Sequence, residues 1–399
     1  MSAATHGPLH GVTVVSLEHA IAAPFCTRQL ADLGARVIKI ERPRVGDFAR
    51  GYDSRVRGLS SHFVWTNRSK ESVALDLKDE QAAPLLEALL GRADVLVQNL
   101  APRAAQRLGL SFEQLHPRHP RLVVCDISGY GEGGDYERKK AYDLLIQSEG
   151  GFLSVTGGPG EEQMAKAGCS IADIAAGMYA YSGILAALLQ RQRTGLGSRV
   201  EVSMLEALVE WMGYPMYYAF DGAPPPPRAG ASHSTIYPYG PFPTGDGGTV
   251  MLGLQNEREW QSFCDQVVDL PELAADPRFA SNAQRSAHRD ELRVIIVERF
   301  AALTLAQVEQ RLEGAAIASA QVRDMAAVWA HPQLRARGRW REVGSPAGAI
   351  PALLPPAGNS SYAARMDAVP DLGEHTEAVL RELGVDEPGL ARLRQRGAI

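Results

Sequence analysis

The first half of the chain alternates short β-rich runs with helical stretches. Strands are predicted at residues 12–17, 37–41, 95–98, 122–127 and 200–202, with helices between them, for example at 24–33 and 80–90. Segments that alternate in this way form a parallel sheet with helices on both faces. A chain of 399 residues is also too long for one compact core. The sequence therefore predicts an α/β fold, with a doubly wound, Rossmann-like large domain and a second, smaller domain.

The pattern changes twice, which predicts three segments. Residues 1–222 hold the alternating elements and form the large domain. Four consecutive prolines then interrupt the chain. After them, a hairpin around Thr244-Gly-Asp-Gly-Gly248 and several helices predict a small α+β domain over residues 223–330. Residues 331–399 end in a helical stretch that we expect to return to the large domain.

The composition is that of a soluble enzyme, with 45% apolar and 22% charged residues and a net charge of −5. That charge gives no general attraction to nucleic acid or to an anionic membrane. The N-terminus lacks a basic stretch followed by an apolar core, so no signal peptide is predicted. The four cysteines are far apart and form no C-x-x-C pair, which fits a reducing cytoplasm. The histidines show no metal-binding spacing, so no metal site is expected.

The usual nucleotide motifs are missing. No G-x-G-x-x-G follows the first strand, and neither a Walker A motif nor a G-x-S-x-G motif occurs, so no nucleotide redox cofactor is expected. Basic residues do cluster near the predicted strand ends: Lys39, Arg42, Arg44, Arg68, Lys70, Lys78, Arg103 and Arg107. Each alone is typical of a solvated surface. Together, on successive connections of one sheet, they suit an extended anionic ligand with several phosphates.

Asp173 lies near the start of the longest apolar run, residues 171–189, which is interpreted as a buried core helix. An Asp in the first turn of a helix often serves only the helix dipole, which it stabilises by roughly 0.3–1 kcal/mol. A carboxylate half-withdrawn from water can instead act as a nucleophile or a base. Asp173 alone leaves both interpretations open.

Short motifs follow one another in a fixed order along nearly the whole chain. They are Gln29-Leu-Ala-Asp-Leu-Gly-Ala35, Val37-Ile-Lys-Ile-Glu-Arg-Pro43, Gly46-Asp47, Asn67-Arg-Ser-Lys70, Leu75-Asp-Leu-Lys78, Gln98-Asn99-Leu100, Ser128-Gly-Tyr-Gly131, Ala141-Tyr-Asp143, Ala172-Asp173 with Gly177, Arg193-Thr-Gly-Leu-Gly197 and Gly373-Glu-His-Thr376. In this order they resemble the class III CoA-transferases, a family that includes formyl-CoA transferase, carnitine CoA-transferase and α-methylacyl-CoA racemase.

This resemblance implies that Asp173 is a nucleophile that attacks an acyl-CoA thioester. It implies contacts with coenzyme A, the substrate that carries the acyl group, at Ile21, Ala22, Arg42, Leu75, Asp76, Leu77, Lys78, Asn99, Leu100, Ala101, Arg107, Lys140, Ala141, Tyr142 and Asp143. Candidate contacts with the carboxylate substrate are His19, Arg228 and His233. The family fold is an intertwined homodimer with each active site at a subunit interface.

Transferase is favoured over racemase because of one position. The racemase branch has a His before the Asp that matches Asp143, whereas this chain has Tyr142, and a tyrosine pKa of about 10 makes a poor base at neutral pH. Ile21 replaces the Gln of formyl-CoA transferase, and the consecutive glycines of that enzyme are absent from residues 228–239. The expected substrates are therefore C4–C5 dicarboxylates such as succinate, malate, citramalate, itaconate or mesaconate. An inactive CoA-binding homologue, and transfer within one molecule, stay open.

Overall fold

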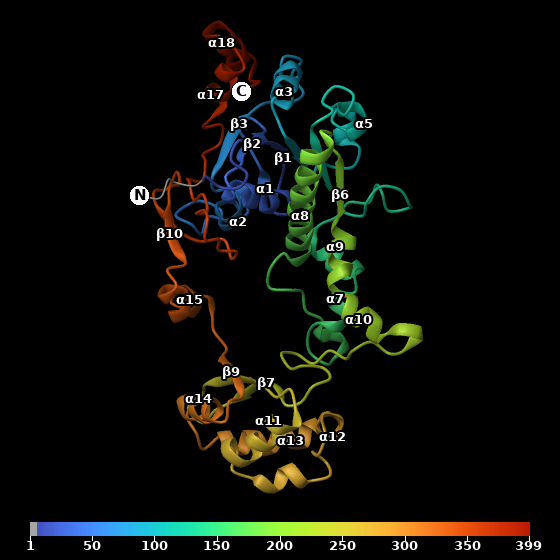
Figure 1. Cartoon of the computed structure of the whole chain (residues 1–399), viewed down its shortest axis with the longest axis vertical. Coiled ribbons are helices and arrows are strands. Elements are labelled where there is room, and N and C mark those ends of the chain that lie inside the picture. The colour runs from blue at the N-terminus through green and yellow to red at the C-terminus, as the bar shows by residue number, and fades with distance from the viewer. Residues whose placement is uncertain (1–5) are drawn as a thin grey trace. The chain divides into compact units, whose positions relative to one another are not determined.

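The computed structural model describes residues 6–399, which divide into two compact units. The first unit holds the chain up to Gly150 and then the segments Ala167–Met212 and Leu334–Ile399. The second unit holds Gly151–Lys166 and Gly213–Gln333. The chain therefore leaves the first unit just before the helix that carries Asp173, returns for that helix, and leaves again after it. Figure 1 traces this path.

A six-stranded sheet forms the centre of the first unit. Its strands are β1 (Thr13–Leu17), β2 (Arg36–Glu41), β3 (Lys70–Ala74), β4 (Val95–Gln98), β5 (Val123–Ser128) and β6 (Arg199–Ser203). They lie in the order β3-β2-β1-β4-β5-β6, and every neighbouring pair is parallel. This is the strand order of a doubly wound sheet, whose direction of winding reverses between β1 and β4. The predicted parallel α/β architecture is confirmed.

Helices cover both faces of this sheet. On one face, α3 (Ala82–Leu90), α5 (Phe112–Leu115) and α17 (Thr376–Glu382) share a hydrophobic core with strands β1 to β5. On the other face, α1 (Ala22–Asp32) contacts β2 and β4, and α8 (Ile171–Thr194) contacts β5 and β6. Because both faces are buried, the strands are nearly continuous apolar runs rather than alternating ones.

The helix α8 is long and apolar enough, by length and composition alone, to cross a membrane. Its alanines Ala172, Ala175 and Ala176 and its Ile184 are fully buried. The helix packs against α1 and against α9 (Met204–Trp211), and it ends at Gly195 in the left-handed conformation. This is the position of a core helix, as the sequence predicts.

The edge strand β3 was missed by the sequence analysis. It begins with Lys70 and Glu71, which are typical of an exposed loop, yet Lys70 is buried with 3% of its surface exposed. The C-terminal segment covers the free edge of β3. The Ala74 N–H donates to Thr376 Oγ1 at 2.9 Å, and the His375 N–H donates to the Ser72 carbonyl at 2.9 Å. Leu334–Ile399 belongs to the first unit, and this segment protects an edge that would otherwise be open to pairing.

The remaining elements of the first unit are short. They are η1 (Phe48–Gly51), α2 (Ser61–Thr66), α4 (Ala104–Arg107), α6 (Asp143–Glu149), α18 (Glu387–Arg396) and the antiparallel pair β10 (Trp340–Val343) and β11 (Ile350–Leu353). The helix α16 (Pro332–Ala336) lies where the chain passes from the second unit to the first.

The second unit has its own core around an antiparallel sheet of β7 (Tyr239–Pro243), β8 (Thr249–Gly253) and β9 (Ala318–Gln321). The predicted hairpin is present as the β7–β8 pair. Its helices are α7 (Phe152–Val155), η2 (Glu161–Gln163), α10 (Gly213–Tyr218), η3 (Phe220–Gly222), α11 (Glu257–Ser262), the π-helix η4 (Phe263–Val267), η5 (Pro271–Ala275), α12 (Asn282–Ala287), α13 (Arg289–Phe300), α14 (Leu305–Gly314) and α15 (Met325–Trp329).

Candidate active site

The topology of the first unit brings Asp173 to the carboxyl edge of the sheet. The helix α8 precedes β6 and runs against the strand direction, so its N-terminus lies at that edge. The helix α1 follows β1, so its N-terminus lies at the same edge. Ligands of open α/β sheets bind there, near the point where the winding reverses.

Asp173, in the first turn of α8, faces the N-terminus of α1. The backbone N–H of Ala22, the first residue of α1, acts on the Asp173 carboxylate and lowers its pKa. Gly177 makes this approach possible, because a Cβ there would lie 2.7 Å from the Ala22 carbonyl oxygen. The carboxylate therefore lies against the positive end of a helix other than its own.

Asp143 is the second carboxylate at this position. Its Oδ1 accepts hydrogen bonds from the Ala172 N–H at 2.8 Å and the Asp173 N–H at 3.3 Å. Its Oδ2 accepts from Gln147 Nε2 at 2.6 Å, and Gln147 Oε1 accepts from the Ala167 N–H at 2.9 Å. Gln147 is fully buried. The segment before α8, its first turn and α6 are thus joined by one hydrogen-bonded network.

The environment of Asp173 makes it an unusual aspartate. Burial is the main cause that raises its pKa, to about 7, and the neighbouring charge of Asp143 raises it further. The hydrogen bond from Ala22 acts in the opposite direction. At neutral pH the carboxyl group is therefore close to half ionised, and its carboxylate is much more basic than that of an exposed Asp.

The turn between β1 and α1 is held by groups from neighbouring segments. Asn99 accepts a hydrogen bond from the His19 N–H and donates one to the His19 carbonyl, both at 2.9 Å. Asp47 accepts from the N–H of Ala20, which has a left-handed backbone with φ of 60°. Because Asn99 follows β4, the turn is tied across the point where the winding of the sheet reverses.

A cluster of buried charges lies beneath this turn. Lys70 Nζ donates to Glu18 at 2.7 Å and to the carbonyl of Pro24 in α1 at 3.0 Å. Lys39 Nζ donates to Asp47 at 2.7 Å. Glu18, Lys39 and Asp47 have no exposed surface. Burial lowers the pKa of Lys70 to about 8, against the attraction of Glu18. These groups hold the first turn of α1 in place.

The sequence analysis assigned all the basic residues near the strand ends to an anionic ligand, and for three of them this was wrong. Lys39 and Lys70 belong to the buried cluster, and Arg68 makes a bidentate ion pair with buried Asp32 at 2.8–2.9 Å. Their charges are neutralised inside the unit, so they cannot reach a ligand.

Four other cations keep their positions at the carboxyl edge with their charges free. Arg42 follows β2, Lys78 follows β3, Arg107 ends α4, and Lys140 precedes α6. All four are exposed, and within residues 6–399 none of them forms an ion pair with a carboxylate. Arg42 donates only to the Gly46 carbonyl, at 3.2 Å. They remain the candidates for phosphate contacts.

The other residues that the resemblance assigns to coenzyme A lie on the same strand-to-helix connections. Asp76, Leu77, Asn99, Leu100 and Ala141 are partly exposed, Ala101 is exposed, and Tyr142 is 67% exposed. Ile21 caps α1 and, like Ala22, has its side chain buried. Leu75 is buried in the core with 1% of its surface exposed, and its N–H donates to the Glu41 carbonyl at 2.8 Å, so it offers no surface to a ligand.

Tyr52 was missed by the sequence analysis. It follows η1, and its ring lies 5.8 Å from that of Phe48, which stacks on His19 at 5.1 Å. Burial, and then the charges of Asp47 and Asp173, raise the pKa of the Tyr52 hydroxyl to about 12. Its hydroxyl is therefore neutral at neutral pH, and it lies close enough to the nucleophile candidate to respond to its charge. No motif surrounds it in the sequence, so no local signal marks it.

The three candidate contacts for the carboxylate substrate differ in their surroundings. Burial lowers the pKa of His19, so its imidazole is neutral at neutral pH, and within residues 6–399 its buried Nδ1 has no hydrogen-bond partner. Arg228 and His233 lie in the second unit. Arg228 donates to the carbonyls of Gly158 and Gly160 at 3.1 and 2.7 Å, and His233 Nδ1 accepts from the backbone N–H of Ile236 at 3.1 Å.

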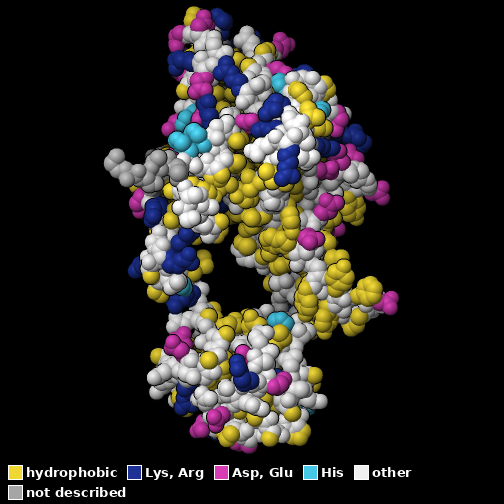
Figure 2. Space-filling view, in the orientation of Figure 1, with side chains coloured by type: hydrophobic (Ala, Val, Ile, Leu, Met, Phe, Trp, Pro, Cys, Tyr) yellow, Lys and Arg dark blue, Asp and Glu magenta, His cyan; other side chains and the backbone are white. Residues whose placement is uncertain are grey.

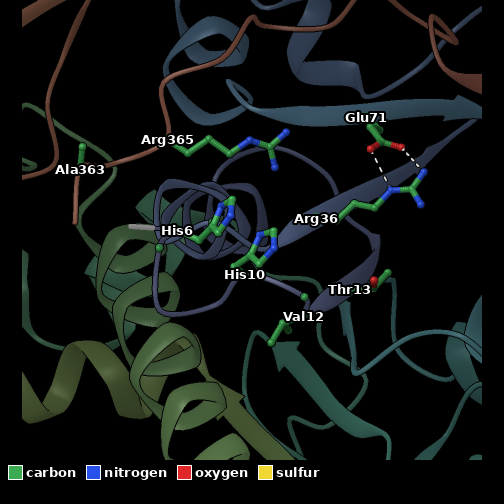
Figure 3. A pocket seen from close by; sticks show the side chains of 11 residues that line it. His6, His10, Val12, Thr13, Arg36, Glu71, Ala363 and Arg365 are labelled. Atoms are coloured by element: carbon green, nitrogen blue, oxygen red, sulfur yellow. Dashed lines mark hydrogen bonds and ion pairs between the residues drawn. The ribbon is translucent and has the colours of Figure 1, made fainter. Parts of the chain in front are cut away.

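A cavity of about 610 Å³ opens at the opposite, amino edge of the sheet (Figure 3). The rings of His6 and His10 stack there at 3.9 Å. Arg36 pairs with Glu71 through two hydrogen bonds of 2.8–2.9 Å, and Arg365 pairs with Asp367. Its arginines are neutralised by their own partners, so the cavity does not compete with the carboxyl edge as the site. Among residues 6–399, no group of three or more His, Cys, Asp or Glu is arranged to hold a metal ion.

Comparison with known proteins shows the family of this chain. The family model described as CoA-transferase family III matches residues 9–376. The chain belongs to CoA-transferase family III. The human succinyl-CoA:glutarate CoA-transferase is 31% identical over 98% of this chain and 90% of its own. The succinate–glutarate CoA-transferase of Agrobacterium fabrum is 33% identical over 94% and 96%. The acetyl-CoA:oxalate CoA-transferase of Acetobacter aceti is 34% identical over 83% and 85%.

The fold of this family III CoA-transferase is also known from experiment. A crystal structure of a CAIB/BAIF family protein from Brucella suis superposes with a TM-score of 0.84, at 31% identity, over 95% of this chain and all of the other. The protein is therefore an enzyme that moves coenzyme A between an acyl-CoA and a carboxylate.

Proposed function

We propose that Asp173 is the nucleophile of this CoA-transferase and that the reaction runs through covalent aspartyl intermediates. The observation that carries the proposal is the carboxylate itself. It is partly buried, its pKa is raised to about 7, and it lies where α8 packs closely against the start of α1, so that the Ala22 N–H opposes this rise. An activated carboxylate beside a preorganised backbone donor is what attack on a thioester requires.

The proposed reaction has four balanced steps. The Asp173 carboxylate attacks the acyl carbonyl of the donor and expels CoA thiolate, which leaves a mixed anhydride. The thiolate attacks the aspartyl carbonyl, releases the donor carboxylate and forms an aspartyl-CoA thioester. The acceptor carboxylate attacks this thioester and again frees the thiolate. The thiolate then attacks the acceptor carbonyl, forms the new acyl-CoA and returns Asp173 as a carboxylate. The Ala22 N–H is placed to stabilise an oxyanion at the aspartyl carbonyl.

Coenzyme A is proposed to lie along the carboxyl edge of the sheet. Arg42, Lys78, Arg107 and Lys140 are exposed there without carboxylate partners, so their charges are free for phosphate groups. Asp143 is the exception among the residues that the resemblance assigns to this ligand. Both its oxygens already accept hydrogen bonds from the protein.

The test of the proposed nucleophile is chemical trapping. Incubation with succinyl-CoA, followed by hydroxylamine or borohydride, should modify Asp173 and no other carboxylate. In the Asp173→Asn variant we expect transfer to fall by at least about a thousandfold, because the attacking group is gone, while CoA binding is kept. Modification at another carboxylate, or a variant with more than about a tenth of the native rate, would exclude Asp173 as the nucleophile.

The proposed substrates are C4–C5 dicarboxylates. In support, two relatives are named for succinate or succinyl-CoA and glutarate, which are dicarboxylates of four and five carbons. A third is named for oxalate, the shortest dicarboxylate. His19 is proposed to donate a hydrogen bond to the substrate, since within residues 6–399 its buried Nδ1 makes no hydrogen bond and has only the Asp47 carboxylate near it, at 3.9 Å. Arg228 and His233 remain proposed contacts for the second carboxylate, although both already have partners in their own unit.

A panel of acceptors tests this substrate class. Succinate, glutarate, malate, citramalate, itaconate and mesaconate should give much higher kcat/KM than formate, acetate or butyrate, because a site built for two carboxylates leaves a polar group unpaired when one is missing. If one monocarboxylate equals the best dicarboxylate, the substrate class is wrong and the family assignment is unaffected. A donor that carries its own second carboxyl group tests transfer within one molecule.

Racemisation is the alternative, and it requires a second acid or base across from Asp173. At the position where the racemase branch has His, Tyr142 is 67% exposed. Exchange of the α-hydrogen of a branched acyl-CoA with deuterated water, in the absence of an acceptor, would support racemisation instead of transfer.

The intertwined homodimer and a cytoplasmic location are proposed from the same resemblance. Hydrophobic side chains gather over α8 and α9 in Figure 2. On these two helices, Leu189 is 55% exposed, Trp211 is 45% exposed and Met178 is 37% exposed. A surface of this kind suits contact with a second subunit. A monomer by analytical ultracentrifugation at micromolar concentration would rule the dimer out.

A further inference from the structure

We propose that Asp143 is a positioning residue for this reaction, because its carboxylate caps the helix that carries the nucleophile and holds an unneutralised negative charge beside it. This inference rests on the proposed role of Asp173. It assigns to Asp143 an action through the nucleophile instead of contact with coenzyme A.

The first observation is the cap of α8. The residue that precedes this helix, Ser170, makes no side-chain hydrogen bond to the first turn. The free N–H groups of Ala172 and Asp173 donate instead to Asp143 Oδ1, at 2.8 and 3.3 Å. An unpaired first turn would fray, and Asp173 would move with it. Asp143 therefore fixes the backbone of the nucleophile from a different helix, α6.

The second observation is that Asp143 is itself held in place. Its Oδ2 accepts from Gln147 Nε2 at 2.6 Å, one turn further along α6, and Gln147 is fully buried. Gln147 Oε1 then accepts from the Ala167 N–H, in the segment that leads into α8. Both oxygens of Asp143 are thus engaged on the protein side.

The third observation concerns charge. All donors to Asp143 are neutral amides, and within residues 6–399 no Lys, Arg or His pairs with it. The groups that act on the charge of Asp173 are Asp143 from α6 and the Ala22 N–H from α1, and Asp173 and Tyr142 in turn raise the pKa of Tyr52 after η1. No cation is among them. The two carboxylates therefore repel each other across a poorly solvated gap.

This repulsion has a consequence for the covalent steps. An ionised Asp173 carries a charge that Asp143 opposes, and this opposition adds to burial in raising the pKa of Asp173 to about 7. Once Asp173 is acylated, as an anhydride or as a thioester, its charge is gone and so is the repulsion. Asp143 therefore favours the covalent intermediates over the free carboxylate, and it makes that carboxylate more basic.

The test variant is Asp143→Asn, which keeps an oxygen to cap α8 and removes the charge. The measurement is the rate at which succinyl-CoA forms an adduct on Asp173 in a single turnover, between pH 5 and 9, by intact-protein mass spectrometry. In the native enzyme this rate should fall toward low pH, and that acid limb of the pH–rate profile should report the ionisation of Asp173. In the variant we expect its midpoint to fall by about one pH unit, with a tenfold change in the ionisation constant. The fraction of enzyme held as adduct at equilibrium should also fall.

Glu149→Gln is the matched control, because it removes one negative charge from the same helix α6. Glu149 pairs with Lys139 and does not face Asp173. The midpoint of the acid limb of the Glu149→Gln variant should stay within about 0.2 pH units of the native one. If Asp143→Asn does not fold, as judged by circular dichroism and Tm, Asp143→Ser supplies a smaller neutral cap for the same measurement.

The possible results distinguish the proposed role of Asp143 from the proposed role of Asp173 as the nucleophile. A folded charge-removal variant whose acid limb stays within about 0.3 units of the native one overturns the role of Asp143 and leaves Asp173 as the nucleophile. Absence of any adduct on Asp173 in the native enzyme overturns both. A purely structural role for Asp143 would lower Tm and total activity without moving the acid limb, so that result also counts against the proposal.

Discussion

Gly177 is the residue on which the contact between α8 and α1 most directly depends, and Gly177→Ala tests that contact. The added Cβ would lie 2.7 Å from the Ala22 carbonyl oxygen and 3.0 Å from Phe25 Cδ1, whereas ordinary contacts are 3.4–4 Å. The nearest obstacle is backbone, which cannot rotate away. The two helices must therefore separate by about 0.7 Å, because a packed interior has no spare volume.

The expected change in the free energy of unfolding of Gly177→Ala follows from two opposing effects. Alanine in place of glycine inside a helix stabilises it by about 1 kcal/mol, and overpacking costs about 1–3 kcal/mol. The net effect on unfolding is thus a loss of about 0–2 kcal/mol. The effect on activity should be larger, because the separation moves the Ala22 N–H away from the Asp173 carboxylate. Displacements of about 1 Å can cost a hundredfold in rate, so we expect kcat/KM to fall by about ten- to a hundredfold.

Gly183→Ala is the matched control in the same helix. Its Cβ would also meet an atom at 2.7 Å, but that atom is Cγ1 of Val200, a side chain that can adjust. This variant gains the same helix propensity and should keep kcat/KM within about twofold of the native enzyme. Steady-state transfer rates and thermal unfolding of both variants test whether the close contact at Gly177 affects activity. Equal activity in the two would show that the spacing of α1 and α8 does not control the reaction.

Three further predictions follow from the same site. Arg42→Ala should raise KM for the CoA substrate by about ten- to a hundredfold with little change for the acceptor, whereas the opposite pattern would place Arg42 on the acceptor side. Lys70→Met should destabilise the protein by about 3–5 kcal/mol in urea unfolding, because it leaves Glu18 buried without its nearest cation. Adding Glu18→Gln should restore much of the lost stability, and a double variant as unstable as Lys70→Met would refute the pairing. Asp173→Asn should raise Tm most at pH 8, above the raised pKa of about 7, where the folded native enzyme carries a disfavoured charge, and hardly at all near pH 3, below the ordinary Asp pKa of about 4, where the group is protonated in both the folded and the unfolded state; equal Tm shifts at both pH values would contradict the raised pKa.

The sequence predicted the elements whose pattern is local. Strands β1, β4 and β5 are mostly apolar runs, β2 and β6 alternate charged and apolar residues, and each of the five is present within one residue or so of its expected bounds. The strand β3 was missed because Lys70 and Glu71 read as a surface loop. That interpretation is wrong because Lys70 Nζ donates a hydrogen bond to Glu18, which follows another strand, at 2.7 Å, and the lysine can therefore be buried. A pairing across 52 residues leaves no periodic signal in the sequence.

The candidate site was also predicted only in part, because contacts between distant segments leave no local signal in the sequence. Spacing placed the basic residues near strand ends, but it could not separate the buried cations Lys39 and Lys70 from exposed ones such as Arg42, because burial depends on partners from other strands. The position of Tyr52 beside Asp173 depends on η1 folding back toward the first turn of α8, and no motif encodes it. Asp143 was found by its motif, but its contact with α8 exists only in three dimensions.

The site combines opposing effects on one carboxylate, and the balance between them suits its proposed role. A helix N-terminus at Ala22 stabilises the charge of Asp173, so the carboxylate is available near neutral pH. Burial and the charge of Asp143 act against it, so the same carboxylate is far more basic than an exposed one, which titrates near pH 4. If the helix terminus dominated, Asp173 would be fully ionised but a weak nucleophile. If burial acted without that helix terminus, the pKa of Asp173 would be higher still and less of the carboxyl group would be ionised at neutral pH. Gly177 and Asp143, from opposite sides of the first turn of α8, set the distances on which this balance depends.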